Sequence, residues 1–562
     1  MSHFTHTALR ATWLTVFVAA CTDSTPTAGP LLSGRGSSGA VDAPQFRDVS
    51  GVEVPLPPWG RAWDTDDQAL VNAVAAGDGY AVVAFKEPGS ARVKETGFRA
   101  AVTVRTIETG VKLVEGLGGT VTGYMTNMGA VAVKLPPSVA RVLRQHPLVD
   151  YVEPRQRLEL AGFPARAVAF VAQGSQTRPW GVDMIHAPWV WGTTTTGSAE
   201  NGGVKVLVID APYYRGHEDL PVIPLANCGN DGCSPGNNSH GTFVLGEITA
   251  RSNSVGIVGV APGVEDGNVY FWAGCNSFDG FCPSERVTQG IDQGVSWGVD
   301  VISMSIAGAY DLGVAEAARR AWYADVVTVA AAGNCWNNDS LCTIERYPAA
   351  LIDVIGVSGV RDNGLFANTS PCRDPFGDIA TSRYGWWVDL AGPFWSRSAV
   401  NNGGYEDEDQ DWCGTSMATP FVSGTVALMR AKNPTIPNWQ IQNILFSTAE
   451  DRGYSGWDIF YGYGIVRADN AVGTVPPLLQ ASIAGPSEVQ PDYPCTWSAQ
   501  VGGGQGPYTI QWSGVLSGSG YEVSGSLSAP GWLYLDVTDG AGNTDGDQLY
   551  ITVSWSAPTC GF

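Results

Sequence analysis

Charged side chains are scarce in this chain, and cationic ones are scarcer still. Only 15% of its 562 residues are Asp, Glu, Lys or Arg, well below the usual quarter or so. The 32 Lys and Arg are outnumbered by 54 Asp and Glu, which gives a formal net charge of −22. A surface of that sign repels phosphate, so we expect no nucleic acid among the partners of this protein.

Long apolar runs are also missing. The apolar run nearest the start of the chain covers residues 11–20 and follows Arg10. It is too short to span a bilayer permanently, and a short apolar run after a positive charge is typical of an export signal. It ends in Val18-Ala19-Ala20-Cys21, a pattern similar to a bacterial lipobox. Two interpretations stay open: an ordinary signal peptide over residues 1–20, or cleavage before Cys21 with a lipid anchor on its thiol. Either one predicts a secreted or cell-surface protein.

The sequence has neither a Cys-x-x-Cys repeat nor a cluster of histidines, which argues against a zinc site. Of its 11 cysteines, ten remain when Cys21 is set aside. These ten fall as neighbours along the chain: Cys228/Cys233, Cys275/Cys282, Cys335/Cys342, Cys372/Cys413 and Cys495/Cys560. Sequence alone does not prove this pairing, but disulfides fit an exported protein because oxidising compartments preserve them.

Composition and hydrophobic patterning divide the chain into segments. Residues 21–75 are rich in Ser, Thr, Gly, Pro and Asp and predict a flexible linker. Residues 76–160 alternate strand and helix patterns and predict a small α+β unit. Its expected strands and helices cover residues 79–86, 103–117, 130–135, 137–146 and 149–153.

Two larger patterns follow. In residues 175–474, apolar strands alternate with helical stretches, which predicts an α/β fold with a parallel sheet and helices on both faces. The expected strands are 204–209, 257–260, 300–304, 326–330 and 353–357. Residues 480–562 show short alternating strands and Gly-rich turns, which predict a β-sandwich, immunoglobulin-like in architecture. Its role is open between substrate binding, surface attachment and spacing.

The most informative motif is the run Cys-Gly-Thr-Ser-Met-Ala-Thr-Pro at residues 413–420. Ser416 begins an apolar helical stretch, where unpaired backbone N–H groups stabilise a hydroxyl or an oxyanion. A lone serine there is usually a helix cap. Asp210, however, ends a buried strand pattern, and His240 begins a second apolar helix pattern. A serine nucleophile needs such a base, held in turn by a carboxylate, and the order Asp, His, Ser is a known one.

On these residues the chain resembles the subtilisin-like serine peptidases, the subtilases. The resemblance implies that Ser416 attacks the scissile carbonyl, that His240 is first general base and then general acid, and that Asp210 orients His240. It implies that Asn334, which follows the strand pattern of residues 326–330, donates to the oxyanion beside the Ser416 backbone N–H. The expected activity is hydrolysis of protein or peptide bonds through an acyl-enzyme, without a catalytic metal.

The same resemblance extends to residues 76–160, which are similar to the inhibitor-like propeptide of many subtilases. It implies a zymogen in which this unit assists folding and plugs the active cleft as an intramolecular inhibitor. Residues 155–174 are the expected joint where maturation cuts. We expect the protein to be a monomer.

Two departures from the family pattern keep a second function open. The family usually follows its Asp with a small hydroxyl residue and Gly, whereas this chain has Ala211-Pro212. A second His often follows the Thr of the His motif, whereas this chain has Phe243. Neither change removes a catalytic atom, but a catalytically inactive subtilase fold acting as a binding or surface protein stays an alternative.

Substrate-contacting residues also follow from the resemblance. The walls of the first specificity pocket would come from Ser305, Ile306, Ala307, Ala331, Ala332 and Gly333. Arg346 stands where the family places the floor of that pocket, so it would favour an acidic or polar residue before the scissile bond. The alternative is a surface arginine paired with Glu345.

A structural calcium site is the last expectation that the resemblance carries. Calcium needs about six hard oxygen donors. The expected ligands are Gln176, Asp219, Arg251, Asn253, Val255 and Ile257, with the backbone carbonyl acting at Arg251, Val255 and Ile257. His186 and His217 fit no pattern of a base, and we interpret them as structural.

Overall fold

The computed structural model describes residues 66–87, 102–161, 176–191, 203–230, 232–233, 239–264, 266–337, 340–373, 378–406, 412–540 and 542–560. The predicted export signal, the lipobox and most of the predicted linker lie outside these ranges. Among the described helices, none combines the length and the apolarity that crossing a membrane requires.

The first described part is an α+β unit. Its strands form an antiparallel sheet in the order β2-β3-β1-β4. The elements are α3 (Asp67–Ala76), β1 (Tyr80–Phe85), α4 (Val104–Gly116), β2 (Thr120–Met125), β3 (Ala130–Lys134), α5 (Pro137–Arg144) and β4 (Val149–Pro154). Side chains of the sheet and the three helices share one buried core, because each helix turns its apolar stripe toward the strands.

Helix α3 corrects the prediction that residues 21–75 are all linker. Asp66 caps the helix by accepting hydrogen bonds from the backbone N–H groups of Gln68 and Ala69. Leu70 and Val74 lie one turn apart on the helix and are fully buried in the core of the α+β unit. The end of the predicted linker is therefore part of a packed core.

A seven-stranded parallel sheet forms the centre of the next part. Its strand order is β16-β14-β12-β10-β6-β8-β7, and every neighbouring pair is parallel. The sheet strands are β6 (Val206–Asp210), β7 (Cys228–Gly229), β8 (Val269–Ala273), β10 (Val301–Met304), β12 (Val327–Ala331), β14 (Ile355–Val360) and β16 (Leu390–Pro393). The principal helices are α8 (His240–Thr249), α9 (Ser284–Trp297), α10 (Leu312–Tyr323), α11 (Thr415–Lys432) and α12 (Asn438–Thr448).

Shorter elements complete this part. They are β5 (Arg157–Leu160), α6 (Trp180–Met184), α7 (Pro188–Trp191), β9 (Phe281–Pro283), β11 (Ile306–Gly308), β13 (Asn334–Trp336), β15 (Ala380–Ser382), β17 (Ser398–Val400), β18 (Gly404–Glu406) and α13 (Ala468–Thr474). Strands β9 and β11 lie on either side of β5 in a separate three-stranded sheet.

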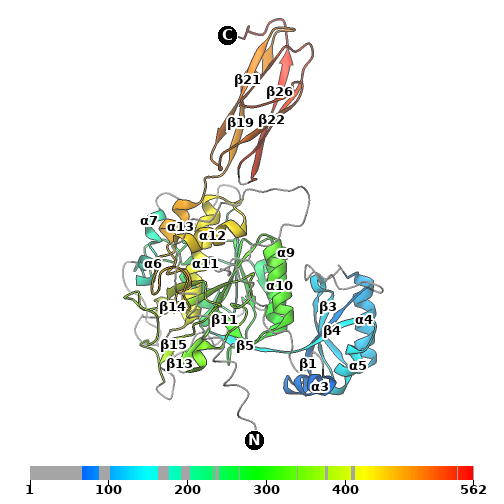
Figure 1. Ribbon diagram of the computed structural model, residues 1–562, viewed down its shortest axis with the longest axis vertical. Coiled ribbons are helices and arrows are strands. Elements are labelled where there is room, and N and C mark those ends of the chain that lie inside the picture. Colours follow the sequence, from blue (N-terminus) through cyan, green and yellow to red (C-terminus); the bar gives the residue numbers. More distant parts are fainter. Residues whose placement is uncertain are drawn as a thin grey trace, which may run out of the picture. The chain divides into compact units, whose positions relative to one another are not determined.

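Helices cover both faces of the central sheet, as the sequence predicts. Val206 and Val208 of β6 pack into a core with residues of α8 and α11, while Leu207 and Ile209 pack into a second core with residues of α9 and α10. Figure 1 shows α9 and α10 on one side of the strands and α11 on the other. Because the strands are buried on both faces, they read in the sequence as continuous apolar runs.

One predicted strand of this sheet is wrong. Residues 257–260 form no strand of the sheet, although Ile257 and Val260 are fully buried. They belong to a loop that is linked to Thr177 by one isolated bridge. The strand next to β6 in the sheet is β8 instead. The prediction failed because a short apolar run does not by itself distinguish a strand from a buried loop.

The last part is a β-sandwich of two sheets, with strand orders β19-β21-β24 and β20-β26-β25-β22-β23. The strands are β19 (Gln480–Ala484), β20 (Glu488–Val489), β21 (Cys495–Gly502), β22 (Thr509–Gly514), β23 (Gly518–Ser519), β24 (Glu522–Gly525), β25 (Gly531–Thr538) and β26 (Thr544–Val553). Trp497 and Leu533 lie in the core between the two sheets. The five cysteine pairs suggested by the sequence are all disulfide-bonded.

Candidate active site

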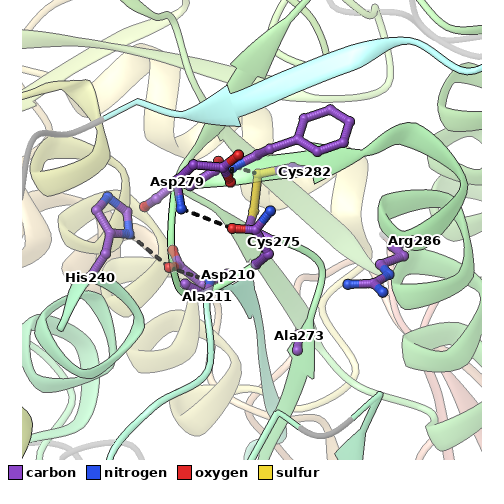
Figure 2. The surroundings of a disulfide bond; sticks show 12 residues. Asp210, Ala211, His240, Ala273, Cys275, Asp279, Cys282 and Arg286 are labelled. Carbon is purple, nitrogen blue, oxygen red and sulfur yellow. Dashed lines mark hydrogen bonds and ion pairs between the residues drawn. A yellow bond between two sulfur atoms is a disulfide. The ribbon is translucent and has the colours of Figure 1, made fainter. Parts of the chain in front are cut away.

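Asp210 and His240 meet where β6 ends and α8 begins. The His240 Nδ1 atom lies 2.7 Å from the Asp210 Oδ1 atom, and both side chains are fully buried. Figure 2 shows the imidazole directed at this carboxylate. Because a carboxylate accepts hydrogen bonds, Nδ1 is the ring nitrogen that carries a proton in this pair. The backbone N–H of Ala211 donates to the same carboxylate oxygen at 2.7 Å, so Asp210 stays aimed at His240 although Ala211-Pro212 follows it.

Ser416 is the second residue of α11, and it is buried. Gly414, just before the helix, has φ 154° and ψ 168°, a conformation that essentially only glycine adopts. The Ser416 hydroxyl donates to the Ser305 carbonyl oxygen at 3.0 Å, and the Ser305 hydroxyl donates to the Ser416 carbonyl oxygen at 2.7 Å. Ser416 is thus held against the segment that precedes β11.

Helices α8 and α11 pack against each other near their first turns. Phe243 of α8 and Met417 of α11 belong to one small cluster with Val400 and Trp412. The Phe243 ring stacks on Trp412 at 5.2 Å, and the His240 ring lies 5.9 Å from Trp412. Phe243, the second departure from the family pattern, therefore takes part in aromatic packing beside His240. Sequence reasoning missed Trp412, although it directly precedes the Ser416 motif.

Two N–H groups converge on the carbonyl oxygen of Ala161. The Ser416 backbone N–H donates to it at 2.9 Å, and the Asn334 side-chain Nδ2 donates to it at 2.6 Å. Thr415 fixes the direction of the Asn334 amide, because its backbone N–H and its hydroxyl both donate to the Asn334 Oδ1 atom, at 2.9 and 3.1 Å. Sequence reasoning missed Thr415 and Ala161.

Strand β5 leads to Ala161 and lies between β11 and β9 in the three-stranded sheet. It pairs antiparallel with both, and Leu160, Glu159 and Leu158 lie opposite the three residues of β11, Ile306, Ala307 and Gly308. The Ala161 backbone N–H then donates to the Ser305 carbonyl oxygen at 3.0 Å. Ser305, Ile306 and Ala307, the residues expected to contact an extended substrate, are paired here with a segment of the protein itself.

A disulfide lies on the β9 side of β5. The Cys275–Cys282 bond closes a loop that begins after β8, and Figure 2 shows it next to Asp210. The Cys275 backbone N–H donates to the Asp210 carbonyl oxygen at 3.1 Å, while Cys282 of β9 pairs with Leu158. Strand β9, which pairs with β5, is thus joined by a disulfide to Cys275, whose backbone is in turn hydrogen-bonded to Asp210.

The stretch from Ala331 to Gly333 is the predicted opposite wall of the specificity pocket. The Ala332 carbonyl accepts from the Trp387 indole at 3.2 Å, and the Gly333 N–H donates to the Thr415 hydroxyl at 3.0 Å. A Cβ atom on Gly333 would lie 2.9 Å from Arg346 Cγ, so the Arg346 side chain runs along this wall.

Two arginines flank that wall. Within the described residues, Arg346 forms no ion pair with Glu345, which removes support for that alternative. Arg383, which sequence reasoning missed, donates from Nε to the Asn334 carbonyl at 2.8 Å and from its guanidinium to the carbonyls of Leu341 and Ile344. It links the backbone at Asn334 to the segment that contains Leu341 and Ile344.

Comparison with known proteins decides the family. The subtilase family profile matches residues 203–464, which contain Asp210, His240, Asn334 and Ser416. Subtilisin NAT of Bacillus subtilis subsp. natto is 30% identical over 378 residues, which cover 67% of this chain and 89% of that protein. The chain belongs to the subtilase family.

Other relatives agree with this subtilase assignment. Subtilisin DY of Bacillus licheniformis is 32% identical over 299 residues, covering 53% of this chain and 99% of that protein. Alkaline elastase YaB of Bacillus sp. (strain YaB) is 30% identical over 347 residues, covering 61% of this chain and 79% of that protein.

The six residues expected to bind calcium lie together in this subtilase. Four oxygens surround the Gln176 Nε2 atom: the carbonyls of Arg251 at 2.6 Å, Val255 at 3.3 Å and Ile257 at 2.7 Å, and Asn253 Oδ1 at 3.3 Å. The Asp219 carboxylate borders this cage and accepts from Asn253 Nδ2 and the Ile257 N–H, both at 2.8 Å. Burial raises the pKa of Asp219 to about 6. Several oxygens around one point form a donor set that fits a hard cation such as Ca²⁺.

The cage contains mostly carbonyl and amide oxygens. In the described part of the chain, no group of three or more His, Cys, Asp or Glu side chains is placed to hold a metal ion.

The other two histidines of this part have structural partners. The ring of His217 is hydrogen-bonded through Nε2 to the Gly404 carbonyl at 2.8 Å, and burial lowers its pKa. The Nδ1 atom of His186 lies 2.9 Å from the Arg467 guanidinium and 3.3 Å from Asp469. Neither ring approaches Ser416 in these contacts, which agrees with their interpretation as structural residues.

Proposed function

We propose that this subtilase is an exported serine endopeptidase, made as a zymogen, whose first substrate is its own Ala161–Gly162 bond. The observation that carries the proposal is the position of the Ala161 carbonyl. Its oxygen accepts from the Ser416 N–H at 2.9 Å and from Asn334 Nδ2 at 2.6 Å, next to the hydroxyl that would attack. Donors aimed at a carbonyl oxygen in this way stabilise the charge that develops on it during acyl transfer.

The proposed reaction starts with a rotation of the Ser416 hydroxyl away from the Ser305 carbonyl, to which it donates at 3.0 Å. His240 then accepts the hydroxyl proton while Oγ forms a bond to the Ala161 carbonyl carbon. Asp210, bonded to Nδ1 at 2.7 Å, favours the imidazolium that results. The carbonyl oxygen becomes an oxyanion held by the two donors.

Collapse of this tetrahedral intermediate breaks the bond between Ala161 and Gly162. His240 returns the proton to the Gly162 nitrogen, and Ala161 is left as an ester on Ser416. A water molecule, deprotonated by His240, attacks the ester, and the serine regains its proton. The same cycle on other proteins or peptides constitutes the endopeptidase activity.

The α+β unit would inhibit the enzyme before and after this cut. Strand β5 fills the groove that an extended substrate would use, and its Leu158 side chain is fully buried there. Arg155 forms an ion pair with Glu285 of α9, and the Tyr151 hydroxyl lies 3.4 Å from Glu316 of α10. These contacts support the role of residues 76–160 as an inhibitory propeptide, because they hold the unit against two helices of the peptidase.

Two further features belong to this proposal. The five disulfides support export, because they persist in oxidising compartments.

Calcium would bind in the cage of Arg251, Asn253, Val255 and Ile257, with Gln176 turned so that its amide oxygen faces the ion. The two amide atoms differ only in assignment, so this turn requires no change in the backbone. The ion would fix the loop after α8 and supply no chemistry to the reaction.

Labelling with a fluorophosphonate probe tests the proposal against an inactive subtilase. Processed wild-type protein should be labelled on Ser416, because only a serine activated by a base reacts with the probe. Ser416→Ala and His240→Ala should not be labelled, while Ser482→Ala, on an exposed strand of the sandwich, should match the wild type. Absence of label on a correctly folded, processed wild-type protein would refute the activity.

A further inference from the structure

The two outer faces of the C-terminal sandwich differ in chemistry. The outer face of the β19-β21-β24 sheet carries only small or polar side chains: Gln480, Ser482, Ala484, Thr496, Ser498, Gln500, Glu522 and Ser524. The outer face of the other sheet carries Trp532, Tyr534 and Tyr550, which are 43%, 39% and 44% exposed. The first face shows that small and polar residues are enough to form a soluble outer face in this sandwich. The exposed aromatic residues of the second face therefore need another explanation.

The three aromatic rings form one surface. Trp532 and Tyr534 are alternate residues of β25, and their rings lie within 25° of parallel with centroids 6.4 Å apart. Tyr550 of β26 pairs with Trp532, and its ring stands at 63° to the indole with centroids 5.1 Å apart. Two rings therefore form a floor and the third forms a raised side.

Hydrogen-bonding side chains surround these rings in the same face. In the sheet register, Ser513 and Gln548 flank Tyr534, and Gln511 pairs with Asp536 one step further along. In the described part of the chain, the side chains of Gln511, Ser513, Asp536 and Gln548 form no hydrogen bond to other residues. They are available to a ligand that lies across the rings.

Charge narrows the class of ligand. Residues 480–562 contain no lysine, arginine or histidine, while Asp536 lies on the aromatic face itself. Nucleic acids, anionic lipids and sulfated or uronic polysaccharides need cations, so this face disfavours all of them. The ligand that fits is uncharged, with flat apolar surfaces and many hydroxyl groups.

We propose that the outer face of β22, β25 and β26 binds an uncharged polysaccharide. A pyranose ring presents C–H groups on its flat faces and hydroxyls around its edge. The C–H groups match the negative faces of the Trp532 and Tyr534 rings, and the hydroxyls match the neighbouring amide, hydroxyl and carboxylate groups. A proline-rich peptide would also cover aromatic rings, but it would leave those polar side chains without partners.

Sedimentation with insoluble polysaccharides tests this proposal. The full chain would carry Ser416→Ala to prevent self-digestion, and the probes are chitin, microcrystalline cellulose and curdlan. The parent protein should bind at least one probe saturably, and W532A together with Y534A should weaken that binding about tenfold or more. Y521A and W555A, which remove exposed aromatic side chains elsewhere in the sandwich, should bind like the parent.

Cross-strand aromatic pairs also stabilise sheets, so folding must be separated from binding. Gln511→Ala with Gln548→Ala leaves the rings in place and should still weaken binding severalfold, with an unchanged thermal transition. The proposal would be overturned if the parent protein bound none of the three probes. It would also be overturned if the variant W532A with Y534A bound as well as the parent. Polyproline and soluble oligosaccharides of the bound polysaccharide would each be tested as competitors. If polyproline displaces the protein from the polysaccharide and the oligosaccharides do not, the ligand of this face is a peptide and the proposal is wrong.

Discussion

The carbonyl oxygen of Ala161 lies 2.6 Å from the side-chain Nδ2 atom of Asn334. This contact joins the end of the N-terminal unit to the residue expected to stabilise the oxyanion. The amide is held from behind by Thr415, so its N–H is directed before any substrate arrives. Such preorganisation means that the protein need not rearrange its dipoles when charge develops.

Replacement of Asn334 by Ala should lower kcat about 100- to 1000-fold and change KM little, because the lost hydrogen bond strengthens in the transition state. Steady-state kinetics on a peptide substrate of the processed enzyme measures this split. Asn337→Ala, three residues further along the chain, is the control and should keep wild-type kcat. A rise in KM at constant kcat would assign Asn334 to substrate binding instead.

Peptides that copy residues 158–161 test the specificity pocket. With Ala, Glu or Phe at the last position, kcat/KM should be higher for Ala and Glu than for Phe. The Arg346 side chain lies close to Gly333, where it would crowd a large ring and supply a positive charge. Arg346→Ala should reduce cleavage after Glu and increase cleavage after Phe.

Arg373→Ala, at an exposed position outside the pocket, is the control for this panel and should keep the wild-type order. Equal rates for all three peptides in the wild type, or an unchanged order in Arg346→Ala, would remove Arg346 from the determinants of specificity.

Calcium removal should lower the thermal stability of the protein. A ligand that binds only the folded state stabilises it by mass action, so EGTA should lower Tm and added Ca²⁺ should restore it. Asn253→Ala removes one oxygen of the cage and should reduce the difference between the two conditions, while Asn470→Ala should not. Identical melting curves with EGTA and with Ca²⁺ in the parent protein would exclude the site.

Glu247 of α8 predicts a pH dependence of stability. Its carboxyl group is buried with no hydrogen-bond partner among the described residues, and burial raises its pKa well above the ordinary value of 4.5. The folded state therefore binds this proton more tightly than the unfolded state does. The contribution is fully present below the unfolded pKa and is lost as pH rises through the folded pKa.

Melting temperature against pH, measured on Ser416→Ala protein with and without Glu247→Gln, checks this sign. The two curves should coincide at acid pH, and the Gln variant should become the more stable one as pH rises. Asp362→Asn, which changes an exposed carboxylate, should follow the parent throughout. Curves that separate at acid pH and converge at alkaline pH would contradict the assignment.

Local patterns predicted much of this architecture. The apolar run that ends at Asp210, the helix that begins at His240 and the helix that contains Ser416 each have a local sequence pattern, and the structure has all three. The gathering of Gln176, Asp219 and Asn253 followed from family resemblance, since nothing in their local sequence places three distant loops side by side.

Other features depend on contacts between distant segments. The pairing of β5 with β11 links residues about 150 positions apart. The local sequence of neither segment predicts the register that brings Ala161 to Asn334. Helix α3 was missed because its largely apolar segment comes at the end of a stretch rich in Ser, Thr, Gly, Pro and Asp. Residues 257–260 were mistaken for a strand because burial, and not extended pairing, explains their apolar character.

The most direct test of the account is the N-terminus of the purified protein. Wild-type protein and Ser416→Ala would be refolded separately and examined by intact mass and N-terminal sequencing. The account predicts a wild-type product that begins at Gly162 and a variant that stays joined at that bond. A wild-type protein left uncut between Ala161 and Gly162, or equal cutting of the variant, would contradict it.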